Sequence, residues 1–390
     1  MRLNVRSKLV FSAVSAMITI FGSRLALGLK SVGKSLGLGV CAASLFALGS
    51  PSSAAPIYSI VAFGDSLTDI GNNQVLFGNT PSSSIVGNSF IPNAGPYESG
   101  TYSNGPIWAD YLATTLGLPP LGPSLLSPAA GGMVFAYGGA RVNAPTPGVP
   151  IVVPLLSIQQ QINLYLTGTG NTASTSALYA IAGGGNDARQ TLTNAANLAF
   201  LGGTPFQNIL PAIQADASTY AINVEGQVKQ LRDAGAKDLL VWNVPNLGLT
   251  PSVLELGSAT SEYASTIAME FNSALSTKIS GIPGLTLFDA FSFSSTSLTS
   301  NTSPFAAQGS EACGAFQDKN CNNYFFWDGL HPTTAAHSSI AQAIYANLGS
   351  PTPVPGPLPI LGAAAAFRYS RKLRKRIKDS KPEMGSPIAV

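Results

Sequence analysis

Short apolar runs alternate with longer amphipathic stretches through the middle of the chain, between about residues 56 and 349. Five apolar runs, each ending near Gly, Asn or Asp, predict buried strands at 57–63, 133–137, 177–182, 238–242 and 285–288. Between them, apolar residues recur every three or four positions and predict helices, most clearly at 155–166, 222–231 and 267–275. Strands that alternate with helices favour an α/β fold with a parallel sheet covered on both faces.

Four stretches interrupt this pattern. Gly-, Ser- and Pro-rich sequence at 78–106 and 117–132 predicts long loops, and Ser/Thr-rich sequence at 168–176 and 293–310 predicts connectors. Ligands of such sheets bind beyond the carboxyl ends of the strands. We therefore expect the long loops to form the walls of any site.

Charge is distributed unevenly along the 390 residues. The net charge is +3, yet residues 1–55 hold six basic and no acidic residues, and residues 356–390 hold eight basic and two acidic ones. The 300 residues between them hold seven basic and 16 acidic residues, a net charge of −9. A body this acidic lacks the basic face that binds phosphates, which excludes nucleic acid as a partner.

The composition is that of a globular protein with few metal-binding side chains. Hydrophobic residues make up 45% of the chain and charged residues 10%, which is enough apolar material for a sizeable core. The chain has two histidines, His331 and His337, and three cysteines, Cys41, Cys313 and Cys321. A zinc site rich in His or Cys is therefore excluded, a carboxylate-only site stays open, and we assign no metal ligand.

Residues 1–54 have the order of a secretory signal. Basic residues come first, then an apolar run at 36–48, then small residues at 50–55. We predict cleavage after Ala54, because Pro56 would be a poor first residue. The alternative is a membrane anchor, although the run is shorter than the ~20 residues that span a bilayer.

Residues 350–390 combine a Pro-rich linker, an apolar stretch ending at Phe367 and a basic cluster from Arg368 to Arg376. This order predicts a tail that engages a membrane and keeps its basic end in the cytoplasm. It resembles the PEP-CTERM sorting tail of Gram-negative bacteria, with a shorter apolar run. The resemblance implies processing by an exosortase-like partner in addition to signal peptidase, and a location in the periplasm, envelope or medium; a solvated basic tail is the alternative.

Export changes the interpretation of the cysteines. Cys313 and Cys321 would remain in an oxidising compartment with seven residues between them. We predict a disulfide that holds the segment leading into Trp327 and His331, with two unpaired buried thiols as the alternative.

Candidate chemistry lies at both ends of the body. Ser66 follows the first predicted strand, where the N–H groups at a helix start can stabilise an oxyanion, although a serine there can also be a plain helix cap. Asp328 and His331, three residues apart on one turn, can form an acceptor and a base. His337 has no acidic residue in the four positions before it and is expected on a helix surface, so we predict His331 as the base.

Two further segments offer oxyanion donors. Asn186 ends a glycine run that follows the third predicted strand, and its amide can donate to a developing negative charge. The segment Phe135–Ala140 is a second strand end whose backbone N–H groups could donate.

Three of these segments together, Gly64–Leu67, Gly184–Asp187 and Asp328–His331, resemble blocks I, III and V of the GDSL or SGNH family of esterases and lipases. The resemblance covers roughly residues 57–347. It implies a three-layer α/β/α, flavodoxin-like fold with a central five-stranded parallel sheet. It also implies Ser66 as nucleophile, with Asp328 and His331 as its partners.

The same resemblance implies an oxyanion hole made of the Ser66 N–H, the Asn186 side chain and a glycine of block II. Gly139 matches the register of that block, although Val134 replaces its asparagine. Gly105, within Tyr102–Gly105, matches a segment typical of longer members and is the alternative.

The resemblance then implies a secreted serine esterase or lipase, without cofactor and monomeric, that hydrolyses small-molecule or lipid esters through an acyl-enzyme on Ser66. An acyltransferase or carbohydrate deacetylase with the same triad is the alternative, followed by an inactive envelope binding protein. The chain divides into a targeting segment (1–54), a hydrolase domain (55–349) and a linker with sorting tail (350–390).

Overall fold

The computed structural model describes residues 56–126, 131–144, 155–316 and 320–349. The predicted signal at 1–54 and the predicted sorting tail at 350–390 lie outside the described residues, as does Cys41. Their assignments, and the domain boundaries that follow from them, stay predictions.

Strands and helices alternate through the body, with strands β1 (Ser59–Gly64), β2 (Gly122–Pro123), β3 (Gly132–Val134), β4 (Ala177–Ala182), β5 (Asp238–Trp242) and β6 (Leu285–Phe288). The α-helices are α1 (Asn72–Phe77), α2 (Trp108–Thr115), α3 (Ile158–Gly168), α4 (Gly185–Ala196), α5 (Phe206–Asp233), α6 (Pro251–Leu254), α7 (Ser258–Ile279), α8 (Ala290–Thr299) and α9 (Thr334–Asn347). A π-helical turn at Asn197–Leu201 continues α4, and 3-10 turns lie at Ser82–Ser84, Leu247–Leu249, Cys313–Ala315 and Cys321–Asn323.

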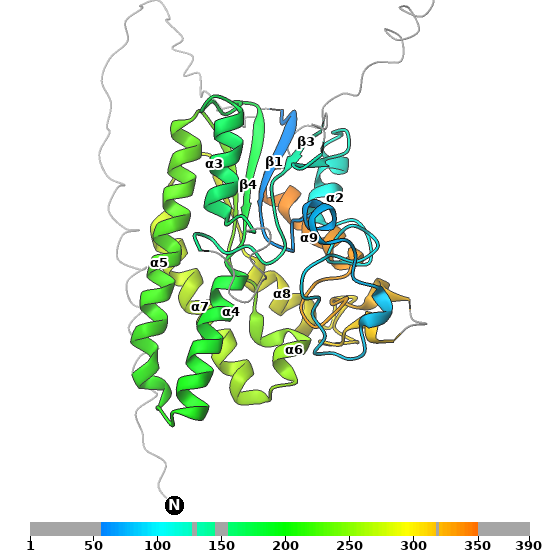
Figure 1. Ribbon diagram of the computed structural model, residues 1–390, viewed down its shortest axis with the longest axis vertical. Helices are drawn as coiled ribbons and strands as arrows, with labels where there is room; N and C mark the ends of the chain where they lie inside the picture. Colours follow the sequence, from blue (N-terminus) through cyan, green and yellow to red (C-terminus); the bar gives the residue numbers. More distant parts are fainter. Residues whose placement is uncertain (1–55, 127–130, 145–154, 317–319, 350–390) are drawn as a thin grey trace, which may run out of the picture. The chain divides into compact units, whose positions relative to one another are not determined.

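The strands form one parallel sheet in the order β2-β3-β1-β4-β5-β6, which confirms the predicted α/β fold (Figure 1). The sheet has six strands in the described residues instead of five. The additional strand, β2, lies at the edge within the stretch predicted as a loop, where Gly122 pairs with Met133. A two-residue Gly-Pro strand leaves no alternating pattern in the sequence, so it could not be predicted.

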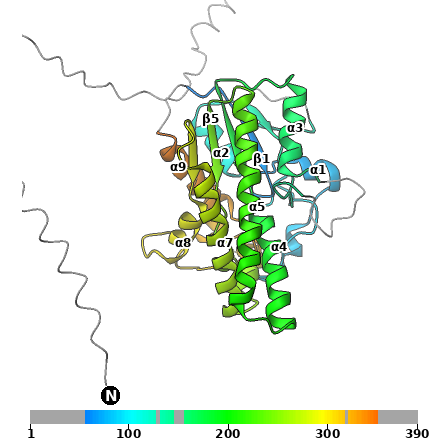
Figure 2. The same cartoon turned by 90° about the vertical axis from the view of Figure 1, so that its left-hand side faces the viewer.

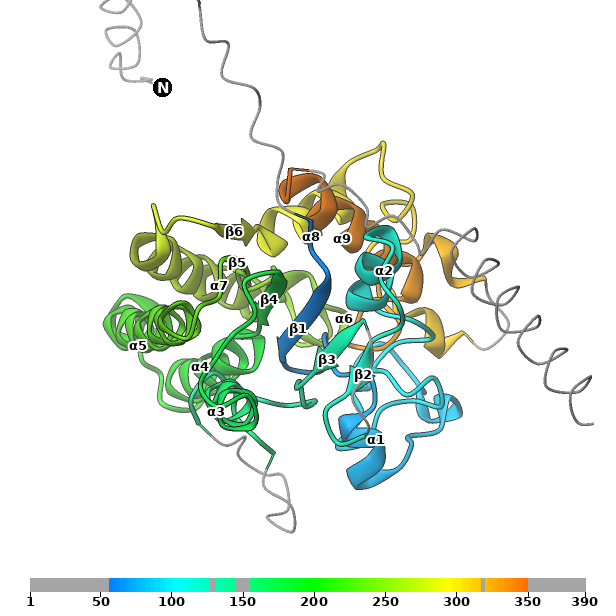
Figure 3. The same ribbon diagram turned by 90° about the horizontal axis from the view of Figure 1, so that it is seen from above.

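Helices cover both faces of the sheet. Along β1, Val61 and Phe63 pack toward α3 and α5, while Ile60 and Ala62 pack toward α2 and α9. Figure 3, which views the sheet from above, shows the strands between these two groups of helices, and Figure 2 shows α5 and α7 side by side over one face. Because successive side chains enter opposite cores, the strands have continuous apolar sequence.

The connector predicted at 293–310 is wrong in its first part, because α8 occupies Ala290–Thr299. The Asp289 side chain caps this helix by accepting the Ser292 N–H at 3.0 Å. Ala290, Ser294 and Leu298, four residues apart, form its buried face. Only one of these three buried residues is a large apolar one, so the Ser/Thr-rich sequence shows no clear helical periodicity here.

The parallel topology gathers the candidate residues at one edge. Ser66 comes two residues after β1, and Asn186 comes four residues after β4. In the described part of the chain, no helix is long and apolar enough to cross a bilayer. Ser66 and Asn186 lie just beyond the carboxyl ends of β1 and β4, at the edge where parallel sheets of this kind bind ligands.

Candidate active site

The structure brings Ser66, His331 and Asp328 into one hydrogen-bonded row. His331 Nε2 lies 2.9 Å from Ser66 Oγ, and His331 Nδ1 lies 2.7 Å from Asp328 Oδ2. All three side chains are buried, with exposed fractions of 8% for Ser66, 2% for His331 and 0% for Asp328. With Nδ1–H donating to the carboxylate, Nε2 can accept the serine proton.

The Asp328 carboxylate accepts four hydrogen bonds. Its Oδ1 accepts the backbone N–H groups of Leu330 and His331, each at 2.7 Å. Its Oδ2 accepts from His331 Nδ1 and from the Tyr97 hydroxyl, the latter also at 2.7 Å. The local turn explains why an Asp and a His three residues apart can bond, and the four donors fix the plane of the carboxylate.

Tyr97 is a participant that the sequence did not reveal. It comes from the predicted loop at 78–106, is 1% exposed, and packs edge-on against Trp327 with ring centroids 5.9 Å apart. Burial, followed by the charge of Asp328, raises the pKa of Tyr97, so its hydroxyl stays protonated and can donate the hydrogen bond to Asp328. An aromatic residue in a Gly/Pro-rich loop is the only signal it leaves in the sequence.

A second tyrosine of this loop packs against the imidazole. The Tyr102 ring lies 5.2 Å from the His331 ring, centroid to centroid. Its hydroxyl accepts from Asn73 Nδ2 at 2.7 Å and donates to the Ala94 carbonyl. The loop at 78–106 thus contacts both His331 and the carboxylate behind it.

Asn186 lies at the start of α4 and lines the same pocket as Ser66. One N–H of its Nδ2 donates to the Ala140 carbonyl at 2.9 Å, which orients the amide and leaves the second N–H for another acceptor. Among the described residues, no group accepts a hydrogen bond from the Ser66 backbone N–H. Both groups are therefore placed to donate to a ligand oxygen.

The two candidate glycines lie in different surroundings. Gly139 precedes Ala140, the residue that Asn186 contacts, and its φ of +83° favours glycine. Gly105 lies against the start of α9, where an added Cβ would come within 3.1 Å of Thr334 Oγ1. The structure thus puts Gly139, rather than Gly105, next to the residue that holds Asn186.

A buried polar cluster after Ser66 holds the segment that carries Gly139. Asp69 Oδ2 accepts the Gly138 N–H at 3.0 Å, and Asn72 Nδ2 donates to the carbonyls of Val134 and Ala136, each at 2.9 Å. Burial raises the pKa of Asp69 to about 6, although the hydrogen bonds from several backbone N–H groups act to lower it. Burial raises the pKa of Asp65 in the same way. The sequence predicted a role for Ser66 but none for Asp69 or Asn72.

A pocket with a cavity volume of about 60 Å³ opens beside Ser66. Its wall is mostly apolar and comes from the ends of β5 and α8, from α9 and from the segment before it; these residues include Trp242, Ala290, Phe293, Phe325, Phe326, Leu330 and Ile340. Its polar lining includes Asp65, Asn186 and Arg189. Two of the apolar residues belong to α8, so the helix that the sequence concealed forms part of the pocket.

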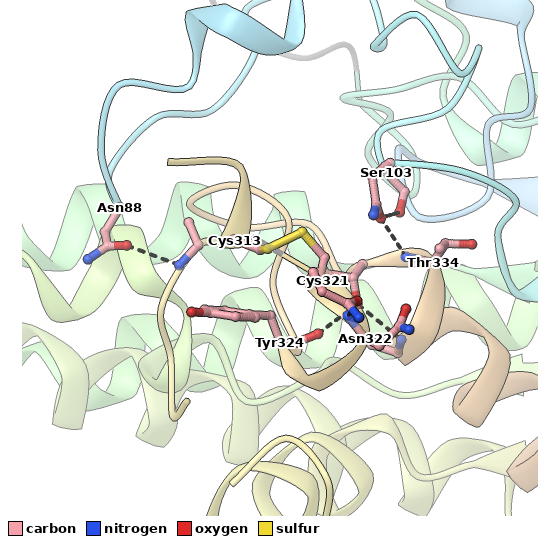
Figure 4. Close-up of a disulfide and its surroundings, with 12 residues drawn as sticks. Asn88, Ser103, Cys313, Cys321, Asn322, Tyr324 and Thr334 are labelled. Atoms are coloured by element: carbon pink, nitrogen blue, oxygen red, sulfur yellow. Dashed lines mark hydrogen bonds between the residues drawn. A yellow bond between two sulfur atoms is a disulfide. The ribbon is translucent and has the colours of Figure 1, made fainter. Parts of the chain in front are cut away.

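The segment that carries Asp328 and His331 is held from two sides. A disulfide joins Cys313 to Cys321, and Asn88 Oδ1 accepts the N–H of Ala312 beside it at 3.0 Å (Figure 4). On the other side, Asn104 Oδ1 accepts the Thr334 N–H at 2.8 Å. The predicted disulfide and the predicted loop thus support the same segment.

His337 was predicted on a helix surface, and this prediction is wrong. It lies in α9 and is 1% exposed, because α9 packs against α2 and the sheet. Burial and the nearby charge of His331 lower the pKa of His337 to about 3. His337 therefore stays neutral near pH 7, and it is His331 that bonds to Ser66.

No group of three or more His, Cys, Asp or Glu side chains comes together as a metal site in the part of the chain that is described.

Comparison with known proteins gives one consistent set of similarities. Residues 60–344 match the family model described as GDSL-like lipase/acylhydrolase. Two GDSL esterase/lipases of Arabidopsis thaliana are each 26% identical over 322 and 341 residues, covering 75% of this chain and 89% and 91% of those proteins. A phospholipase A1 from Streptomyces albidoflavus covers 75% of this chain and 99% of its own, with 17% identity and a TM-score of 0.36.

The Tyr97 hydrogen bond leads to a prediction for serine reactivity. Tyr97→Phe removes the hydroxyl and keeps the ring, and a lost hydrogen bond to a charged group costs about 1.5–3 kcal/mol. We expect the second-order rate constant for labelling of Ser66 by a fluorophosphonate to fall about tenfold. Tyr111→Phe is the matched control, since it removes a hydroxyl that bonds to Thr334 at 2.9 Å outside this row. Equal rates for the two variants would contradict the role of Tyr97.

The buried His337 leads to a prediction for acid stability. In the unfolded chain this residue binds a proton near pH 6.5, but in the folded protein only near pH 3, so acid favours the unfolded state. Its stabilising effect is complete above pH 6.5 and is lost as the pH falls toward 3. From pH 7 to pH 5 we expect this group to lower the free energy of unfolding by about 2 kcal/mol. Urea denaturation should show this pH dependence shrinking by that amount in His337→Gln; the same dependence in both proteins would show the assignment to be wrong.

Proposed function

This chain belongs to the GDSL-like lipase/acylhydrolase family, and we propose that it hydrolyses carboxylic esters through an acyl-enzyme on Ser66. The observation that carries the proposal is the buried row of hydrogen bonds from Asp328 through His331 to Ser66. A serine hydroxyl is a weak nucleophile until a base removes its proton. This arrangement supplies the base together with the group that orients it.

In the proposed first step, Ser66 Oγ attacks the ester carbonyl while His331 Nε2 takes its proton. The imidazolium that forms is stabilised by Asp328, whose orientation Tyr97 helps to hold. His331 then returns the proton to the leaving alcohol, and an ester bond to Ser66 replaces the ester bond of the substrate. Water, deprotonated by the same imidazole, attacks the acyl carbon; the bond to Ser66 Oγ breaks, and the imidazolium returns its proton to Oγ as the acid leaves.

We assign the oxyanion of each tetrahedral intermediate to three donors: the Ser66 N–H, the second N–H of Asn186 Nδ2, and the backbone of Gly139. The first two are supported by the absence of other acceptors among the described residues and by the shared pocket lining. Donors fixed before the reaction stabilise charge without reorganising, which is why such groups contribute strongly to catalysis.

The pocket suggests a short acyl group. Its wall is largely apolar, and a cavity volume of about 60 Å³ is small beside the roughly 300–1,000 Å³ of pockets that bury a drug-sized ligand. An acyl chain of a few carbon atoms fits such a volume, whereas a long fatty acyl chain would have to extend out of it.

We further propose that the enzyme acts outside the cytoplasm as a monomer. The secretory order of residues 1–54 and the sorting-tail order of 350–390 support export and processing by signal peptidase and an exosortase-like enzyme. Removal of both basic ends would leave an acidic mature body, with seven basic against 16 acidic residues between positions 56 and 355.

The proposal is tested by labelling and by a substrate panel. A fluorophosphonate should label the wild type and the exposed-serine control Ser174→Ala, and should not label Ser66→Ala. With p-nitrophenyl acetate, butyrate, octanoate and palmitate, we expect the highest kcat/KM for acetate or butyrate and at least a tenfold fall at octanoate. An adduct in Ser66→Ala would contradict the assignment of Ser66 as the nucleophile. A kcat/KM that is highest for the palmitate ester would contradict the proposed preference for short acyl groups.

Asn186→Ala tests the oxyanion hole. Loss of one such donor lowers kcat by about 10² to 10³ while KM stays nearly unchanged, because the donor is used mainly in the transition state. Asn194→Ala, an exposed amide two turns further along α4, is the control and should keep the wild-type kcat. A large rise in KM at unchanged kcat would mean that Asn186 binds the ground state instead.

A further inference from the structure

One basic side chain lines the otherwise largely apolar pocket. Arg189 lies in α4 three residues after Asn186, so the two side chains project from the same face of the helix, about 5–6 Å apart at their Cβ atoms. A group held by Asn186 therefore lies within reach of the Arg189 guanidinium.

Arg189 has no partner of its own in the described residues. Three other basic side chains of the described body lie in ion pairs with carboxylates, Arg141–Asp187, Lys229–Asp233 and Lys278–Glu225, and Arg232 donates to the Pro283 carbonyl. The Arg189 guanidinium forms no ion pair and donates no hydrogen bond within the described part of the chain, and the charges of Asp65 and Asp328 act on it only at longer range. Burial lowers its pKa, which is the mark of a charge that is poorly compensated.

An unpaired, partly buried guanidinium destabilises a protein unless a ligand compensates it. Its planar fork of N–H donors matches a carboxylate or a phosphate, which each offer two oxygens in one plane. The place of Arg189, one helical turn from the proposed oxyanion donor, puts such an anion a few bonds from the scissile carbonyl.

We propose that the enzyme acts on esters that carry an anionic group, a carboxylate or a phosphate, and that Arg189 binds this group. The inference rests on the proposed esterase function and names its substrate class. A neutral ester bound in the same pocket would cover the guanidinium without giving it a partner. Leaving such a group unpaired lowers the kcat/KM of the neutral ester by about tenfold or more relative to an ester that pairs with it. Because the body carries net negative charge, the preference must come from contact in the pocket and not from long-range attraction.

Two matched pairs of esters test this inference and separate the two sides of the ester. In one pair the anion is on the alcohol: 1-butyrylglycerol 3-phosphate against 1-butyrylglycerol. In the other it is on the acyl group: mono-p-nitrophenyl succinate against p-nitrophenyl butyrate. For at least one pair we expect the wild-type kcat/KM to be at least tenfold higher for the anionic member, and the pair that shows it identifies the side that carries the anion.

Substitution then assigns the preference to Arg189. In Arg189→Gln the ratio of anionic to neutral kcat/KM should fall about tenfold or more, and Arg189→Lys should keep part of it. Lys229→Gln is the control, because it removes the same charge from an exposed i,i+4 pair that does not line the pocket, and it should keep the wild-type ratio. Fluorophosphonate labelling of Ser66 in each variant reports whether the site is still folded.

The possible outcomes distinguish a failure of the anion-binding role of Arg189 from a failure of the proposed esterase function. Hydrolysis of neutral esters with no anionic preference in either pair, or a preference that Arg189→Gln leaves unchanged, overturns the role of Arg189 and leaves the esterase standing. Failure of the wild type to hydrolyse any of the four esters overturns both.

Discussion

The buried carboxylate of Asp328 is the group on which the rest of the site depends. A charge with no exposed surface is tolerated only where hydrogen bonds replace water, and here four donors do so. Two are backbone N–H groups of its own turn, one is the His331 imidazole, and one is the hydroxyl of Tyr97, which is 231 residues away in sequence. The carboxylate therefore joins a local turn to a distant loop, and the imidazole takes its direction from both.

This dependence explains why two segments outside the sheet, the loop at 78–106 and the disulfide-bonded segment, support residues 326–334. The long segment at 78–106 has little regular structure, yet it donates to Asp328 through Tyr97 and packs against His331 through Tyr102. The disulfide holds the chain just before the same segment. A Gly/Pro-rich loop can do this because its rigidity comes from buried tyrosines and side-chain acceptors, not from a backbone ladder.

The sequence predicted best those features that local pattern determines. β4 and β5 begin and end where the apolar runs do, because strands buried on both faces must be largely apolar. The edge strand β6 also matches its run, although only Phe288 of it is fully buried. Asp328 and His331 could be paired from spacing alone, since one turn brings them together. Tyr97 could not, because a hydrogen bond between distant residues leaves no periodicity. The same reason explains His337, whose burial depends on the packing of α9 against α2 and the sheet, which its own neighbours in sequence do not reveal.

The pocket has two chemically different sides, and together they constrain how a substrate can lie. Asn186 and Arg189 come from α4, which packs in the core on one face of the sheet, while Phe293 and Ile340 come from α8 and α9, which pack in the core on the other face. In the proposed binding mode, a carbonyl oxygen held by Asn186 leaves one substituent of the ester for the apolar wall and the other for the Arg189 guanidinium. An ester with one apolar and one anionic end satisfies both sides at once, whereas an ester apolar at both ends leaves Arg189 without a partner.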